Sequence, residues 1–123
     1  MFLECAKQNA PTDSPRPYDW ETKIIVKLGL PDISKLLMYL KLDKPGVPLK
    51  LYHESPAGGN KTVELKYQEY KGRPGYFLQV SYQKDKGEQA NRVSAPVTLD
   101  ESEIIKVALS MAIEVILGWR IPT

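Results

Sequence analysis

Residues 48–99 read PLKLYHESPAGGNKTVELKYQEYKGRPGYFLQVSYQKDKGEQANRVSAPVTL. Apolar and polar residues alternate along four stretches of this segment, at 48–54, 62–70, 76–84 and 91–99. Alternation with a period of two is typical of strands that bury one face. The short connections contain glycine or proline, and connections of this length favour an antiparallel meander. The segment therefore predicts a four-stranded antiparallel sheet.

The alternation divides the predicted sheet into two faces. One parity is apolar and forms a candidate core of Leu49, Leu51, Val63, Leu65, Tyr67, Leu78, Val80, Val93, Ala95 and Val97. The other parity mixes aromatic and basic residues with polar ones: Lys50, Tyr52, Lys66, Tyr70, Phe77, Gln79, Ser81, Arg92 and Ser94. A solvated sheet surface does not require one Phe and two Tyr among its cations, so this face is a candidate binding surface.

A strand and a helix are predicted before this sheet. Ile24–Leu28 is rich in β-branched residues, which predicts a buried strand that ends at Gly29. Pro31 suits the first turn of a helix, and apolar residues then recur at helical spacing through Leu40. With a final helix after the sheet, the order is β-α-β-β-β-β-α, and the fold class is α+β with an antiparallel meander and two helices.

The final helix is apolar at nearly every position from Ile104 to Trp119. Asp100 and Glu103 resemble a capping box at its start, and Gly118 can cap its end. A helix with so little polar surface is expected to pack on its own sheet on one side and on a partner subunit on the other. The residues expected at the subunit interface are Ile105, Leu109, Ala112, Ile113, Ile116 and Trp119.

Length and charge limit the possible functions. A chain of 123 residues forms one domain, which we expect to span residues 18–123 after a flexible, proline-containing arm at 1–17. The net charge is only +2, but the basic residues gather in the middle: residues 61–92 contain seven Lys or Arg and four acids (Lys61, Lys66, Lys71, Arg73, Lys84, Lys86 and Arg92; Glu64, Glu69, Asp85 and Glu88). An anionic partner is therefore expected to approach the middle of the chain.

The expected localisation follows from the absence of two sequence signals, a membrane-spanning helix and a secretory signal. No apolar run reaches the roughly 18 residues that a membrane-spanning helix requires. Met1–Lys7 lacks the basic and long apolar regions of a secretory signal. We therefore expect an intracellular, cytoplasmic protein.

Catalytic chemistry has few candidate residues in this sequence. There is one histidine, His53, and one cysteine, Cys5, in dissimilar contexts, so a Cys/His nucleophile pair and a cysteine-rich zinc site are both disfavoured. Gly58–Thr62 resembles a phosphate-binding loop, but Asn60 stands where that loop needs a glycine, and a strand pattern follows instead of a helix. We expect neither an enzyme nor a bound cofactor or metal.

Single-stranded nucleic acid matches the aromatic and basic face better. Exposed bases stack on aromatic rings at about 1–3 kcal/mol each, and lysines and arginines neutralise phosphates. The candidates for stacking or apolar contact are Tyr52, Tyr70, Phe77 and Tyr82, and Gln79 is a further candidate nucleic-acid contact. The candidate phosphate contacts are Lys50, Lys61, Lys66, Lys71, Arg73, Lys84, Lys86 and Arg92. The alternative is that a helix or a neighbouring subunit covers the rings and that the charges are merely solvated.

The sequence resembles the Whirly family of single-stranded-DNA-binding proteins from Tyr18 to Trp119. The resemblance is carried, in family order, by Tyr18-Asp19-Trp20-Glu21, Leu51-Tyr52-His53-Glu54-Ser55-Pro56, Gly75-Tyr76-Phe77, Pro96-Val97-Thr98 and Gly118-Trp119. It implies two packed antiparallel sheets, helices that assemble the subunits into a tetramer, and DNA strands bound in grooves between subunits with little sequence preference. It also implies a role in DNA repair, recombination, replication or transcription, at the nucleoid.

The chain departs from the family pattern at its start. Family members carry several strands before the Tyr-Asp-Trp motif, including a Lys-Gly-Lys segment tied to DNA binding, whereas seventeen residues precede Tyr18 here. We therefore expect a shortened, prokaryotic- or phage-type relative. Residues 47–119 alone also fit the related coactivator-type fold, which has four strands and one helix and forms a dimer. RNA binding and a structural or protein-interaction role remain the alternative functions.

Overall fold

A computed structural model describes residues 1–8, 18–54, 58–85 and 87–118, and of residues 19–22 it describes only the backbone. Its elements are β1 (Phe2–Gln8), β2 (Tyr18–Lys27), α1 (Leu30–Leu40), β3 (Leu49–Glu54), β4 (Asn60–Tyr70), β5 (Arg73–Gln83), β6 (Asn91–Thr98) and α2 (Leu99–Leu117). The predicted α+β class is confirmed, but the order is β-β-α-β-β-β-β-α, with one strand more than the sequence predicts.

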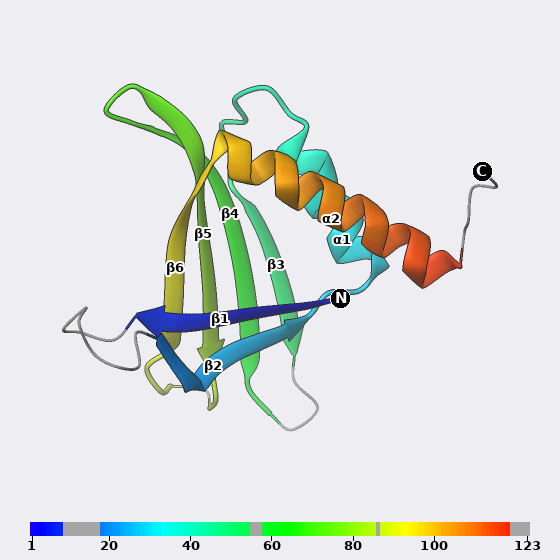
Figure 1. The fold of residues 1–123 in the computed structure, drawn as a ribbon. Coiled ribbons are helices and arrows are strands. Elements are labelled where there is room, and N and C mark those ends of the chain that lie inside the picture. Colours follow the sequence, from blue (N-terminus) through cyan, green and yellow to red (C-terminus); the bar gives the residue numbers. More distant parts are fainter. Residues whose placement is uncertain (9–17, 55–57, 86, 119–123) are drawn as a thin grey trace.

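Strands β3 to β6 form the predicted antiparallel meander, with the order β3-β4-β5-β6. We refer to it as sheet B. Its register places Leu51 opposite Val63 and Val63 opposite Val80, so the apolar parity is continuous across the first three strands. Figure 1 shows the strands of sheet B side by side, with β1 and β2 crossing them as a second, smaller layer.

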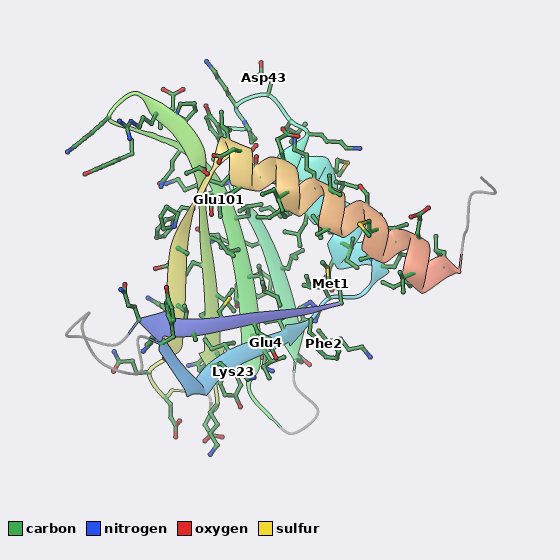
Figure 2. The ribbon with its side chains drawn as sticks, viewed as in Figure 1. Met1, Phe2, Glu4, Lys23, Asp43 and Glu101 are labelled. Atoms are coloured by element: carbon green, nitrogen blue, oxygen red, sulfur yellow. The ribbon has the colours of Figure 1, made fainter. Side chains whose placement is uncertain are left out.

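The extra strand corrects the prediction of a flexible arm over residues 1–17. Phe2–Gln8 pairs antiparallel with β2 to form the two-stranded sheet A, and the Leu28 N–H donates a hydrogen bond of 2.8 Å to the Met1 carbonyl. Figure 2 shows Glu4 and Lys23 on these neighbouring strands, where Lys23 Nζ lies 3.4 Å from Glu4 Oε1. Leu3 and Cys5 pack against the core. The rest of the predicted arm, 9–17, lies outside the described residues.

The hydrophobic core lies between sheet A, the apolar face of sheet B and the two helices. Ile33 of α1 and Val80 of β5 are completely buried, and Val26 of β2 is 1 % exposed. The predicted core residues of sheet B are buried or half-buried with one exception. The exception is Ala95, which is exposed on β6 at one edge of the sheet.

Helix α2 begins two residues before the predicted capping box. Thr98 is its N-cap, since the Thr98 hydroxyl accepts a hydrogen bond from the Glu101 N–H and the Glu101 carboxylate accepts one from the Thr98 N–H. The predicted pair, Asp100 and Glu103, lies within the first helical turns instead. Gly118 caps the other end in the left-handed conformation with φ 68°, as predicted.

Helix α2 starts beside the end of β6 and lies against α1, and its last turns extend away from sheet B (Figure 1). Within the described part of the chain, no helix has the length and apolar character needed to cross a membrane.

Candidate nucleic-acid interface

One face of sheet B points away from the core and from both helices. We call it the outer face and define it by Lys50, Tyr52, Lys66, Tyr70, Arg73, Phe77, Gln79, Ser81, Arg92 and Ser94. These residues come from all four strands, and the antiparallel register brings them to the same side. The alternation in the sequence therefore predicts their common orientation correctly, because side chains two residues apart on a strand share a face.

The cross-strand register sets each ring of the outer face close to a cation or a small polar residue. Lys66 of β4 lies directly opposite Phe77 of β5, and Phe77 lies opposite Pro96 of β6. A second row runs across the sheet through Tyr52, Thr62, Ser81 and Arg92. Directly opposed side chains have Cβ atoms about 5 Å apart, so the residues of each row can contact one bound molecule together.

The tyrosine rings of the outer face are accessible. Tyr52 is 73 % exposed and Tyr70 is 69 % exposed, while Phe77 is half-buried. The hypothesis that a helix of the same chain covers the two tyrosine rings is therefore wrong. A surface hollow also reaches Tyr52, Thr62 and Gln83 at one end of this face.

The cations of the outer face differ in how far they are neutralised. Lys50 Nζ lies 3.7 Å from Glu64 Oε2, and Glu64 is an acid of this face that we did not place among the candidate site residues. Alternation in the sequence is sufficient to place Glu64 on the outer face, because it lies between the core residues Val63 and Leu65. Lys66, Arg73 and Arg92 are exposed, and none of them forms an ion pair with another described residue. Their charges are therefore available to an anionic partner.

The turn between β4 and β5 carries a further cation to the tip of a hairpin. Lys71 and Gly72 have φ of 51° and 75°, as in the two-residue turns that match the twist of antiparallel strands. Tyr70 and Arg73 pair across this turn. Lys71 Nζ lies 5.5 Å from the centroid of the Tyr70 ring, so this predicted phosphate contact lies beside a predicted stacking ring.

Two of the predicted site residues lie on the opposite face. Lys61 pairs with Tyr82 on the core side of sheet B, where Lys61 Nζ donates a hydrogen bond of 2.6 Å to the Ile25 carbonyl of β2. Lys61 Nζ also lies 5.5 Å from the Tyr82 ring centroid. These two side chains connect the two sheets and do not contribute to the outer face. The same parity that places Val63 in the core could have identified Lys61.

The two remaining basic positions fall in the sequence between β5 and β6. Lys84 is exposed just after β5, and Lys86 lies outside the described residues.

Helix α2 is apolar on two sides, and most of the predicted subunit-interface residues lie on the inner one. Leu109 is 3 % exposed in the core, and three further predicted residues, Ile105, Ala112 and Ile113, pack against it. Ile116 is 44 % exposed, and Trp119 lies outside the described residues. The outward side carries Ile104, Val107, Met111 and Val115, which we call the α2 stripe and which are 59–80 % exposed. Periodicity could not distinguish the two sides because both are apolar.

His53 and Cys5, the residues with catalytic potential, have surroundings that are typical of structural residues. His53 Nε2 lies 3.0 Å from Asp32 Oδ2, and this carboxylate also accepts a hydrogen bond from the Gly29 N–H at the start of α1. Burial raises the pKa of the Cys5 thiol, which disfavours the reactive thiolate. No group of three potential metal ligands occurs in the part of the chain that the structure describes.

Comparisons with known proteins agree with this arrangement. The chain matches the crystal structures of WHY1 and WHY3 from Arabidopsis thaliana with TM-scores of 0.75 and 0.76 and 19 % and 20 % sequence identity. Each match covers 96 % of this chain, together with 69 % of the WHY1 chain and 68 % of the WHY3 chain. The structure of the plant transcriptional regulator PBF-2 matches with a TM-score of 0.68 and 19 % identity, over 96 % of this chain and 76 % of that one. At these identities the matches establish the fold.

A comparison with curated proteins gives no match. A family model described as "Whirly transcription factor" matches residues 1–108, which is most of the chain and includes both sheets. This family consists of nucleic-acid-binding proteins without catalytic activity, in agreement with the prediction that the chain is not an enzyme. The chain belongs to the Whirly family.

Proposed function

We propose that this protein binds single-stranded DNA through the outer face of sheet B, with little sequence preference, and acts in DNA repair, recombination, replication or transcription. The observation that carries the proposal is the presence of exposed aromatic rings beside exposed cations on one face, above all Tyr52, Tyr70, Lys66 and Arg73. Membership of the Whirly family supports the same ligand class.

The proposed mechanism divides the binding free energy between bases and phosphates. Unpaired bases stack on the rings of Tyr52, Tyr70 and Phe77, which accept any base because every base has a π face. Phosphates approach Lys66, Arg73 and their neighbours, and this releases counterions from the DNA. A duplex hides its base faces in the stack, so only the phosphate contacts remain available to it.

Self-association through the α2 stripe would extend this surface. Ile104, Val107, Met111 and Val115 recur every three or four residues along the middle and later turns of the 19-residue helix α2, which is the spacing of a helix-packing face. Exposed apolar stripes of this kind typically mark protein contacts. We propose a homo-oligomer, with a tetramer favoured over a dimer, in which grooves between neighbouring outer faces hold the DNA strand.

Fluorescence anisotropy with a labelled single strand tests the proposal. We expect tighter binding to the single strand than to the matched duplex, and a linear fall of log K with log salt concentration. Equal affinity for both forms, or affinity that does not change with salt, would contradict it. Competition with a matched RNA strand decides between DNA and RNA, since RNA differs at the 2′-hydroxyl.

A second candidate function is favoured by the α2 stripe itself. A module that only docks a partner protein would need the stripe but not the cations of the outer face. Reversing Lys66 and Arg73 to Glu would then leave the function intact, whereas a charge at Met111 would abolish it.

A further inference from the structure

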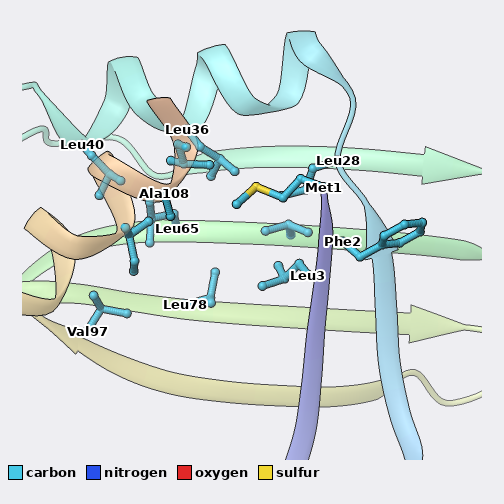
Figure 3. Close-up of a pocket in the computed structure, with 13 residues that line it drawn as sticks. Met1, Phe2, Leu3, Leu28, Leu36, Leu40, Leu65, Leu78, Val97 and Ala108 are labelled. Atoms are coloured by element: carbon cyan, nitrogen blue, oxygen red, sulfur yellow. The ribbon is translucent and has the colours of Figure 1, made fainter. Parts of the chain in front are cut away.

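An apolar cavity of about 190 Å³ lies where the two sheets meet the two helices, and it is open to the surface on one side (Figure 3). Every layer contributes to its lining, for example Leu3 from β1, Leu36 from α1, Leu78 from β5 and Ala108 from α2. Leu65 and Val97 complete its floor on sheet B. The cavity opens to the surface beside Met1, Phe2 and Ala108, which are all exposed. Figure 3 shows the Met1 side chain pointing into the cavity.

The chemistry of the lining is uniform. Each lining residue is Met, Phe, Leu, Val, Ile or Ala, so no side chain offers an N–H or O–H group to an occupant. Water needs two to four polar partners to be stable in a protein interior, which this lining does not supply. A charged or hydroxylated molecule would lose its hydration without gaining hydrogen bonds.

We propose that this cavity is a binding site for one small, uncharged aromatic hydrocarbon with the size of a single substituted ring. An apolar cavity of about 150 Å³ lined by similar side chains stays dry and binds benzene. The cavity of this protein is somewhat larger, at about 190 Å³, so a methyl-substituted ring fits the same chemistry.

Occupancy of the cavity stabilises the folded chain. A ligand in this position contacts Leu65 and Leu78 of sheet B on one side and Ala108 of α2 on another. These residues separate when the chain unfolds, so the ligand binds only the folded state and shifts the unfolding equilibrium by mass action. The site lies on the core side of sheet B and therefore does not overlap with the outer face.

Toluene is the probe, and phenol is its matched control because a hydroxyl replaces the methyl group. We expect toluene to raise the Tm of the full chain in a concentration-dependent way. Phenol should bind at least about tenfold more weakly, because its hydroxyl finds no partner in the cavity. Methyl chemical shifts should change at Leu65, Leu78 and Val97.

Two substitutions on α2 test whether toluene binds in this cavity. Ala108→Leu places extra carbon atoms in the cavity and should weaken toluene binding by at least about tenfold. Ser110→Leu adds a similar bulk to an exposed position of the same helix and should leave toluene binding unchanged.

Four results would overturn the proposal: no stabilisation at saturating toluene, equal binding of phenol, undiminished binding by folded A108L, or methyl shifts confined to Ile104 and Val107 of the α2 stripe. If A108L does not fold, the methyl shifts of the unmodified protein decide the matter alone.

Discussion

Lys66 and Phe77 lie directly opposite each other on strands β4 and β5, with both side chains on the outer face of sheet B. A cation and an aromatic ring are thus held together by backbone pairing, without a flexible loop. One nucleotide placed over this pair can stack its base on the ring while its phosphate approaches the ammonium group. The pair is the smallest unit of the proposed interface, and each half can be tested separately.

Replacing Lys66 by alanine should weaken single-stranded DNA binding and lower the salt dependence of the affinity. The loss of one phosphate contact reduces the slope of log K against log salt by about 1. The exposed side chain makes no ion pair with a described residue, so the unfolding free energy should hardly change. Anisotropy titrations at several salt concentrations measure the slope. Lys35→Ala on α1 is the matched control, and an equal change in that variant would show a general charge effect.

Replacing Tyr52 by alanine should weaken binding by about 5- to 150-fold, which corresponds to the roughly 1–3 kcal/mol of one stacked base. The ring is 73 % exposed, so its removal costs the fold little. Tyr52→Phe keeps the stacking surface and should bind like the unmodified protein. Anisotropy gives the affinity and urea unfolding gives the stability. A Y52F variant as weak as Y52A would show that the hydroxyl, and not the ring face, makes the contact.

Lys61→Met should lower the stability of the protein without lowering the DNA affinity of the folded molecules. The Lys61 ammonium donates a charge-assisted hydrogen bond to the Ile25 carbonyl, and such bonds contribute about 1.5–3 kcal/mol. Methionine keeps most of the chain length but leaves that carbonyl without its donor. Urea unfolding and anisotropy on the same sample separate the two effects. Weaker DNA binding at unchanged stability would restore Lys61 to the interface.

Acid should weaken the N-terminal cap of α2. Hydrogen bonds from the Thr98 backbone and hydroxyl hold the pKa of the Glu101 carboxyl below its usual range. A depressed pKa contributes stability that is complete above the unfolded-state pKa of about 4.3 and is lost as the pH falls through the lower folded-state value. Thr98→Ala removes the hydroxyl and should reduce this loss. Thermal unfolding of both proteins between pH 6 and pH 3 measures it, and identical acid profiles would exclude the Thr98 hydroxyl as a contributor.

The sequence predicted those elements whose own residues show the period of a strand or a helix. Alternation places Lys66 and Phe77 on one face because the period of a strand is two, and no knowledge of the partner strand is needed. Strand β1 escaped prediction because Phe2–Gln8 lacks the alternation of apolar and polar residues, and its stability comes from pairing with β2. The parity that Lys61 shares with Val63 places it on the core side, but its hydrogen bond to the Ile25 carbonyl follows only from the crossing of sheet A over sheet B. Register and burial thus depend on tertiary packing that local patterns do not contain.

Met111→Glu tests whether the α2 stripe mediates self-association. The side chain is 59 % exposed, so the substitution should leave the subunit folded. A charge in an apolar contact is strongly unfavourable when it has no partner, so the assembly should dissociate. Ser110→Glu places the same charge on the neighbouring exposed position outside the stripe, and the assembly of this variant should keep the mass of the unmodified protein. Light scattering after size-exclusion chromatography measures the mass, and circular dichroism confirms folding. Leu109→Glu should instead unfold the chain, because Leu109 is 3 % exposed in the core. An M111E protein with the mass of the unmodified assembly would exclude the stripe as the interface.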